Sequence, residues 1–162
     1  MADAPEYLSV DHISITVTDM DASVRFYAEQ LGLPVKADVT VDDKVSNNPE
    51  YRPLYNASHP QRRLVMLGPV SGATIALIAH PGDDLQGEAS PKLDAVGLNH
   101  FALTVRDLPG LVARMRSFGV EPVAQGYFAD PDGNLIQFEG PGESTQHKDD
   151  YLTRAGQQPT SS

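Results

Sequence analysis

Cysteine and long apolar runs are both missing from this sequence of 162 residues. Without cysteine there is no disulfide, no thiolate metal ligand and no cysteine nucleophile, so a metal would need histidine, carboxylate, amide or water ligands. No stretch reaches the apolar length of a membrane-spanning helix. Residues 1–6 have neither the basic start nor the apolar run of a signal peptide. We therefore expect a cytoplasmic protein that does not associate with membranes.

Basic charge is scarce as well. The chain has 12 Lys and Arg residues against 22 Asp and Glu residues, which gives a formal net charge of −10. Nucleic-acid phosphates require a basic face, and the sequence offers no basic cluster beyond Arg62-Arg63. A nucleophile elbow, a phosphate loop and a dinucleotide-binding fingerprint are also missing. These absences exclude nucleic acid as the expected partner and leave a small molecule.

The chain contains an internal repeat. Residues 10–19 (VDHISITVTD) return 88 positions later as residues 98–107 (LNHFALTVRD). Each copy alternates apolar and polar residues, which is the pattern of a half-buried strand, and each carries one histidine. His12 shares its strand face with serine and threonine, and His100 shares its face with alanine and threonine, so neither looks like a core histidine. Two histidines at equivalent positions indicate one site shared by two similar modules.

Each copy of the repeat is followed by a helical pattern and then by strands. Asp19 or Asp21 can cap the first helix, and Asp107 can cap the second. Further strands are predicted at residues 63–67, 73–80, 127–129 and 134–139. The last two flank residues 130–133 (DPDG), which is strong turn chemistry. The pattern therefore predicts a helix and several strands in each module.

A long polar segment, residues 41–61, is rich in proline and asparagine. It is either an ordinary surface excursion or a lid over a site, since long loops in compact domains are often functional. We expect one domain over residues 1–141, with a flexible tail over residues 142–162 because that stretch is dominated by small polar and charged residues. Within the domain, the two modules span residues 8–81 and 95–141 and are joined by a linker at residues 82–94.

Several of these segments together resemble the vicinal oxygen chelate superfamily, which groups glyoxalase I, extradiol dioxygenases, methylmalonyl-CoA epimerase and the bleomycin and fosfomycin resistance proteins. The resemblance covers about residues 8–141. It rests on the two histidine strands, on Asp19, Phe26-Tyr27 and Leu31-Gly32-Leu33 in the first module, and on residues 127–136 (YFADPDGNLI) in the second. The combination is specific for the superfamily but not for one activity, because the fold hosts many chemistries.

The resemblance implies an α+β fold, in which two βαβββ modules form curved mixed sheets around a shared central cleft that holds one metal site. In metal-dependent relatives, up to four ligands come from the first and fourth strands of each module. Position by position, His12 and His100 match the first-strand ligands, whereas the fourth-strand positions fall on Ala76 and Gln137. Alanine cannot bind a metal, and a glutamine amide neutralises no charge. Both departures weaken the implied site.

Glu139 is the alternative third ligand. It lies two residues beyond Gln137 on the same strand and therefore points to the same face, offset by about 7 Å along the strand. A carboxylate stabilises a divalent ion far more than an amide does, so we expect Glu139 to matter more than Gln137 if a metal is bound. In the other interpretation, Glu139 is a solvated residue at the strand end and Gln137 keeps the family register.

The further candidates for catalysis or substrate binding are Tyr127, His80, Tyr51, Tyr55 and Arg63. Tyr127 matches a tyrosine that hydrogen-bonds substrate in extradiol dioxygenases, with packing as its alternative role. His80 is either an acid/base group at the pocket rim or a plain strand terminus. The two other tyrosines lie in the long polar segment and are candidates for substrate binding. Arg63 is a candidate for binding an anionic substrate, with an ordinary surface arginine as the alternative.

Two classes of function remain open. The first is a metal-dependent enzyme acting on a small oxygenated organic substrate. A dioxygenase is favoured over a glyoxalase-type lyase or isomerase provided that Glu139 coordinates, because two histidines and one carboxylate hold iron in non-haem oxygenases. The ion would be Fe(II) in a dioxygenase and otherwise Zn, Ni or Mn. The second class is metal-free, either a drug-sequestering binding protein or an acid/base enzyme that uses His12 and His100.

Two geometric expectations follow from the repeat. The imidazoles of His12 and His100 should converge on one site, because ligands of one ion each lie about 2 Å from it. The two modules should be related by a pseudo-twofold axis, either side by side in one chain or exchanged within a homodimer.

Overall fold

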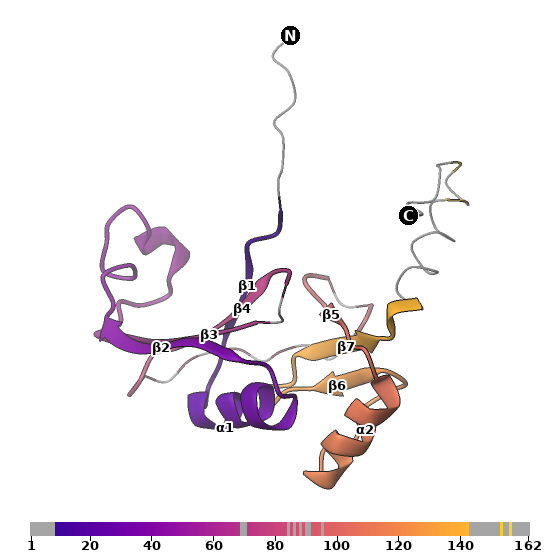
Figure 1. Ribbon diagram of the computed structural model, residues 1–162. Helices are drawn as coiled ribbons and strands as arrows, with labels where there is room; N and C mark the ends of the chain where they lie inside the picture. Colours follow the sequence, from indigo (N-terminus) through magenta and orange to yellow (C-terminus); the bar gives the residue numbers. More distant parts are fainter. Residues whose placement is uncertain are drawn as a thin grey trace. The chain divides into compact units, whose positions relative to one another are not determined.

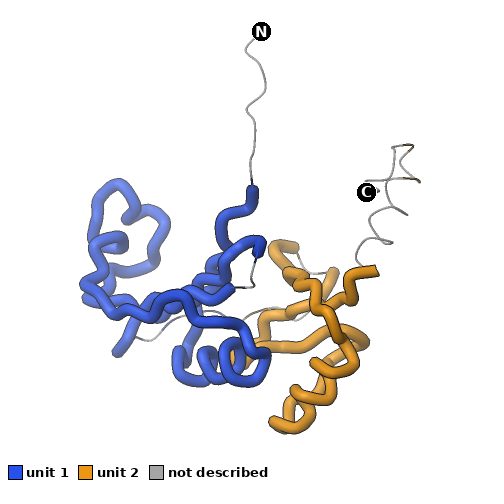
Figure 2. The backbone as a smooth tube through the Cα atoms, viewed as in Figure 1, with its two compact units in different colours: residues 1–87 blue, residues 88–162 orange. Residues whose placement is uncertain are grey.

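Each copy of the repeat opens a separate unit of the computed structural model. Unit 1 spans residues 1–87 and unit 2 spans residues 88–162 (Figure 2). The structure describes residues 9–68, 71–83, 85, 87, 89, 92–94, 96–142, 153 and 156. Most of the expected tail at residues 142–162 and part of the expected linker at residues 82–94 lie outside the described residues. The single-domain organisation over residues 1–141 stays a prediction.

Unit 1 contains a four-stranded mixed sheet with a helix on one side (Figure 1). The strand order is β1-β4-β3-β2, with β1 parallel to β4 and the other neighbours antiparallel. The strands are β1 (His12–Thr16), β2 (Val35–Asp42), β3 (Gln61–Leu67) and β4 (Thr74–Ala79). Strand β2 was not among the strands predicted above. Its apolar residues alternate with polar ones, but all of its residues are exposed except the partly buried Ala37.

A continuous helix follows β1. It consists of α1 (Met20–Val24) and a π-helical continuation, η1 (Arg25–Gln30). Asp19 rather than Asp21 caps it, because the Asp19 carboxylate accepts a hydrogen bond from the Ala22 N–H at 3.0 Å. That bond satisfies a backbone donor at the helix start. Gly32 follows the helix with φ +81°, a left-handed conformation that glycine adopts without Cβ strain.

The alternation along the strands of unit 1 separates an apolar face from a polar one. Residues on the face that α1 covers form the core together with helix side chains, and these are Ile15, Val17, Val65, Leu67, Ile75, Leu77, Met20, Phe26 and Tyr27. His12 and Ser14 project from β1 to the opposite face, because side chains alternate along a strand. The polar face of β1 is therefore left outside the helix-covered core.

Unit 2 repeats this plan with one strand fewer among its described residues. Its sheet has the order β5-β7-β6, with β5 parallel to β7 and β6 antiparallel to β7. The elements are β5 (His100–Thr104), α2 (Leu108–Ser117), β6 (Tyr127–Ala129) and β7 (Leu135–Glu139). Asp107 caps α2 by accepting a hydrogen bond from the Gly110 N–H at 2.9 Å. The core of this unit consists of Phe101, Phe128, Leu135, Ile136, Phe138, Leu111 and Met115.

The predicted turn between β6 and β7 forms around Asp130. Its buried carboxylate accepts hydrogen bonds from the backbone N–H groups of Asp132 and Asn134, at 3.0 and 2.8 Å, and from Asn134 Nδ2 at 2.9 Å. The turn sets the antiparallel register in which Tyr127 lies opposite Gln137. A local sequence signal thus positions two of the candidate site residues.

The predicted fold class is confirmed. Both units are mixed sheets with a helix after the first strand, as an α+β arrangement of two related modules requires. The short connection between α2 and β6 carries a single bridge, between Ala124 and Tyr127, and this accounts for the smaller second sheet. Of the helices that the structure describes, none combines the length and apolar character needed to cross a bilayer.

Candidate functional site

The strand registers of the two units place the candidate residues equivalently. In unit 1, His12 lies opposite Thr74 and Ser14 lies opposite Ala76. In unit 2, His100 lies opposite Leu135 and Ala102 lies opposite Gln137. In each sheet, the fourth-strand position, Ala76 or Gln137, therefore lies two residues further along the strand than the residue opposite the histidine. The correspondence between Ala76 and Gln137, first inferred from resemblance, also holds in the hydrogen-bonded register of each sheet.

Each histidine is paired with the side chain of the residue that precedes it. His12 Nδ1 lies 2.7 Å from Asp11 Oδ2, and His100 Nδ1 lies 2.6 Å from Asn99 Oδ1. The Asn99 amide is oriented by its Nδ2, which donates to the Leu93 carbonyl at 2.9 Å. Both partner oxygens accept, so the ring nitrogen that faces them is Nδ1–H. In the neutral ring, Nε2 then carries the lone pair that a metal or a proton would take.

Sequence analysis did not identify Asp11 and Asn99 as functional residues. The signal was present, because an acceptor side chain precedes histidine in both copies of the repeat. The pairing matters because a hydrogen bond to one ring nitrogen fixes the tautomer and orientation with which the other acts. Of the two rings, His12 is the more open, with 51% of its side chain exposed.

Unit 2 brings four of the predicted site residues together on one sheet face. The His100 and Tyr127 rings meet edge to face, with centroids 5.6 Å apart, and Tyr127 lies opposite Gln137. Gln137 Nε2 donates to Glu139 Oε1 at 2.8 Å. Burial, and then the negative charge of Glu139, raise the pKa of the Tyr127 hydroxyl. The face therefore holds a protonated phenol, an imidazole and a carboxylate-bound amide.

The hydrogen bond between Gln137 and Glu139 assigns them different roles. An ionised carboxylate only accepts, so the amide nitrogen of Gln137 must face it and the amide oxygen is left for another partner. Glu139 lies opposite Thr104, four residues beyond the level of His100, which is about 13 Å along a strand. This register favours Gln137 as the residue that faces a site at His100, with Glu139 as its orienting partner. The structure does not test the ranking of Glu139 over Gln137 that the sequence predicts, and the register favours the opposite ranking.

His80 lies in a buried histidine cluster in unit 1. Only 6% of its side chain is exposed, and its Nδ1 lies 3.2 Å from Oδ2 of the fully buried Asp43 side chain. The His80 ring stacks on the His59 ring with centroids 3.9 Å apart, and Tyr55 meets both rings edge-on. This environment favours a role within the protein over contact with substrate. Sequence analysis gave His59 no role, because nothing in a loop sequence signals a stacked partner 21 residues away.

The two remaining candidates lie apart from these groups. Tyr51 is about half exposed. The Arg63 guanidinium forms a two-pronged ion pair with Asp38 and a further pair with Asp21 of α1. The hydrogen bond to Asp38, followed by the one to Asp21, raises the pKa of Arg63. Because its charge is already compensated on the side of the sheet that α1 covers, Arg63 is a weaker candidate for binding an anionic substrate.

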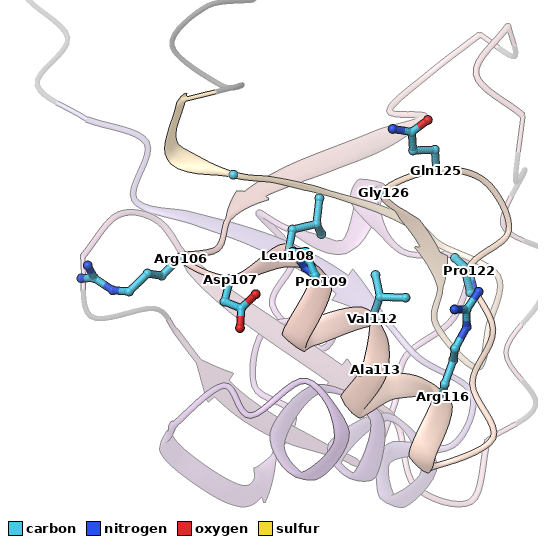
Figure 3. A pocket seen from close by; sticks show the side chains of 11 residues that line it. Arg106, Asp107, Leu108, Pro109, Val112, Ala113, Arg116, Pro122, Gln125 and Gly126 are labelled. Atoms are coloured by element: carbon cyan, nitrogen blue, oxygen red, sulfur yellow. The ribbon is translucent and has the colours of Figure 1, made fainter.

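The described residues of unit 2 also form a pocket of about 860 Å³ beside α2 (Figure 3). Arg106, Leu108, Val112 and Arg116 line it from the helix and its start, and none of the predicted site residues contributes. Within either unit, the described residues include no group of three His, Asp or Glu side chains placed to hold a metal ion. The candidate chemistry of unit 2 therefore lies on the His100 face of the sheet.

Comparison with known proteins gives one family. The model of the Glyoxalase/Bleomycin resistance protein/Dioxygenase superfamily matches residues 9–138. Among curated proteins, no sequence matches the chain significantly.

Solved structures share the fold. A glyoxalase family protein from Bacillus cereus is 20% identical with a TM-score of 0.70, covering 86% of this chain and 98% of that chain. The trypanothione-dependent glyoxalase I of Leishmania major is 25% identical with a TM-score of 0.63, covering 93% of this chain and 99% of that chain. An antibiotic-binding protein from a Streptomyces species is 20% identical with a TM-score of 0.53, covering 85% of this chain and 99% of that chain.

Proposed function

The chain belongs to the glyoxalase/bleomycin resistance protein/dioxygenase superfamily, and we propose that it is a metal-dependent enzyme that acts on a small oxygenated organic molecule. A divalent ion would be held by Nε2 of His12, Nε2 of His100 and Oε1 of Gln137. The proposal requires the two histidines to reach one ion, either within a chain or between two chains of a homodimer. Among the described residues, neither unit holds a group of three candidate ligands by itself.

The observation that carries the proposal is the matched pairing of the two histidines. A metal-bound histidine almost always gives its other ring N–H to a carboxylate, a carbonyl or water. Asp11 provides that partner for His12 at 2.7 Å, and Asn99 provides it for His100 at 2.6 Å. Core packing has no need of two such pairs at equivalent places in a repeat. The Gln137 amide is oriented in the same manner, through its contact with a carboxylate.

The donor chemistry fits a borderline divalent ion. Imidazole nitrogen suits Zn²⁺ and Ni²⁺, with Mn²⁺ also compatible with an amide oxygen. All three proposed ligands are neutral, whereas Asp11 and Glu139 place negative charge one contact further out. A neutral ligand set leaves more positive charge on the ion than a carboxylate set would. Ala76 supplies no fourth ligand, so positions for substrate oxygens stay open.

A bound ion would supply Lewis acidity to the substrate oxygens. That chemistry favours a glyoxalase-type isomerase or lyase. Tyr127 would donate a hydrogen bond to a substrate oxygen, because its raised pKa keeps the hydroxyl protonated across the neutral range. A dioxygenase with Fe(II) would instead need Glu139 to leave Gln137 and coordinate directly. The four-residue offset between Glu139 and the level of His100 weighs against that arrangement.

A metal-free binding protein is the second candidate, and the strands beside β1 favour it. On the face that carries His12, Ala76 lies opposite Met66, and Ile78 lies opposite Leu64. An apolar strip of this kind suits the carbon skeleton of a ligand better than it suits an ion. One structural relative is an antibiotic-binding protein, and the same fold hosts binding and catalysis. In this case the two histidines would be hydrogen-bonding or acid/base groups.

Calorimetric titration of chelator-stripped protein with Zn²⁺, Ni²⁺ and Mn²⁺ separates the two candidates. Gln137→Ala should weaken binding strongly, and Glu139→Gln should weaken it less because an amide can still contact Gln137. Gln125→Ala and Glu121→Gln are the matched controls, since neither residue lies on the His100 face. Binding that is lost in Glu139→Gln but kept in Gln137→Ala would make Glu139 the ligand and restore the dioxygenase hypothesis. No binding by the wild type would favour the metal-free protein.

Two coarser expectations belong to the same proposal. A homodimer would be the natural assembly if the modules are exchanged between chains, and sedimentation of the full chain measures it. A cytoplasmic location is proposed only as the expectation stated above, and fractionation of the source cells tests it.

A further inference from the structure

The stacked histidines of unit 1 join two parts of the chain that the strand ladder does not connect. One part is the segment between β2 and β3, residues 43–60, called the excursion below, which includes the short helix η2 (Arg52–Leu54). The other is the turn that follows β4, residues 80–83. Figure 1 shows the excursion rising from the end of β2 and β3, on the side of the sheet away from α1. Histidine, aspartate and tyrosine side chains make contacts between the two parts.

Two histidine–aspartate pairs form this junction, and each pair links the excursion to the turn. Asp43 and His59, at the two ends of the excursion, contact His80 and Asp83 respectively, at 3.2 and 2.7 Å. The two rings lie nearly parallel, with an interplanar angle of 24°. Asp43 Oδ2 and His80 Nδ1 are buried and have no well-aligned hydrogen bond. The junction is thus closely packed, but the hydrogen-bonding capacity of its buried polar atoms is not fully satisfied. Its stability therefore depends on the protonation states of the histidines and aspartates.

The ends of the excursion are tied to each other as well as to the turn. Asp43 Oδ1 accepts from the backbone N–H groups of Val45 and Ser46, both at 3.1 Å. The His59 backbone N–H donates to Ser46 Oγ at 3.0 Å, and Asn47 Nδ2 donates to the carbonyls of Asp43 and His59 at 2.6 and 2.7 Å. Loss of the histidine contacts would therefore release these hydrogen-bonded ends of the excursion from the turn after β4.

We propose that His59 and His80 form a pH-sensitive latch, which holds the excursion against the end of β4 at neutral pH and releases it on acidification. Two imidazolium rings cannot stack at this separation in a buried site without strong repulsion, so the closed junction limits the protons that it holds. An opened excursion exposes the His80 ring to water, where it takes up a proton freely. Acid therefore favours the open form.

The groups around His80 determine the sign of this effect. Burial, and next the neighbouring His59 ring, lower the pKa of His80, while the Gln61 backbone and the carboxylates of Asp43 and Asp83 act in the opposite direction. The net direction is downward. A histidine whose pKa is lowered in the closed form does not change the stability of that form at pH values above its ordinary pKa of about 6.5. As the pH falls below about 6.5, the histidine destabilises the closed form progressively.

The remaining charged groups do not reverse that sign between pH 5 and 7. Burial opposes ionisation of Asp43, but hydrogen bonds from Ser46 and Val45, together with His80, lower its pKa overall. Its stabilising contribution is therefore lost only at pH values below the ordinary range for a carboxyl group. Tyr55 is uncharged in this range and meets both rings edge to face. Arg62 on β3 precedes the residue paired with Ala79 and is not among the groups that shift the pKa of His80.

Amide exchange measured by NMR on the full chain tests the latch. The Val45, Ser46 and His59 amides report on it because they donate hydrogen bonds within the excursion, to or beside the residues that form the junction. After correction for intrinsic exchange, the equilibrium constant for opening at these amides should rise by about tenfold between pH 7.5 and 5.5. This is the limit for one histidine that takes up a proton only in the open form. His80→Phe keeps a stackable ring and should remove the pH dependence, whereas His147→Phe, a change at a histidine that has no proposed role, should retain it.

Several results would overturn the proposal. Equal opening of the reporter amides at the two pH values in the wild type would do so, as would a pH dependence that persists in His80→Phe. If His80→Phe does not fold, titration of the wild-type His80 ring decides the matter. A midpoint below about 6.5 is expected, and a midpoint above that value overturns the latch. The test uses unit 1 residues only and does not depend on metal binding.

Discussion

Removing the acceptor beside each candidate histidine is the sharpest perturbation of the proposed site. Asp11→Ala deletes the oxygen that lies 2.7 Å from His12 Nδ1, and Asn99→Ala deletes the oxygen that lies 2.6 Å from His100 Nδ1. Neither change touches Nε2, the proposed ligand atom. Any loss of metal affinity therefore reports on orientation and tautomer. Mutation of such outer partners typically weakens metal binding by about 10- to 100-fold.

The two sites should differ in magnitude because they differ in exposure. The side chain of Asp11 is 93% exposed and that of His12 is 51% exposed, so water can replace the lost acceptor. We expect Asp11→Ala to weaken metal binding by about tenfold, the lower end of the range. The pair in unit 2 is partly buried, where water is a poorer substitute. Asn99→Ala should therefore cost more than Asp11→Ala.

Competition with a coloured chelator at fixed pH measures both affinities. Asp11→Asn keeps an acceptor oxygen without the charge, so it should retain most of the affinity if hydrogen bonding is the cause. Asp42→Ala removes the same charge from an exposed position on β2 and is the matched control. Wild-type affinity in both Asp11→Ala and Asn99→Ala would refute the reasoning. Equal losses in Asp11→Ala and Asp42→Ala would mean that only net charge matters.

Three other predictions concern the scaffold of unit 2. Asp130→Ala removes the acceptor of three hydrogen bonds in the turn, and it should lower the free energy of unfolding by about 3 kcal/mol in a urea titration. Gly126→Ala places a Cβ 2.8 Å from a backbone oxygen at φ +73° and should be clearly more destabilising than Gly119→Ala, where φ is +77° and the space is open; equal costs would contradict this. Spectrophotometric titration should give Tyr127 a raised pKa that Glu139→Gln brings down only in part, since burial is the larger cause.

The repeat made much of the fold predictable. Period-two alternation around each histidine gave β1 and β5, an aspartate after each strand gave a helix cap, and the DPDG sequence gave the turn before β7. These signals are local, because each depends on residues within a few positions of one another. Family resemblance then supplied the equivalence of Ala76 and Gln137, which the strand registers support.

Other features depend on contacts that no local pattern carries. His59 and His80 stack across the excursion, and only the folded chain brings their rings together. The bond between Gln137 and Glu139 depends on side-chain conformations, so parity alone could not rank the two as ligands. Strand β2 did leave a local signal, since Val39 and Val41 alternate with polar residues. The polar residues that follow dominate the composition of the region and mask that signal.

The metal content of the full chain, purified without chelators, tests the central claim most directly. Elemental analysis should find close to one equivalent of a divalent transition metal per chain in the wild type, and almost none in His12→Ala or His100→Ala, with the fold retained by circular dichroism. The paired loss is essential, because the claim is that histidines from the two units hold the same ion. Metal retained in either histidine variant, or a wild type that neither carries nor takes up metal, would contradict the account.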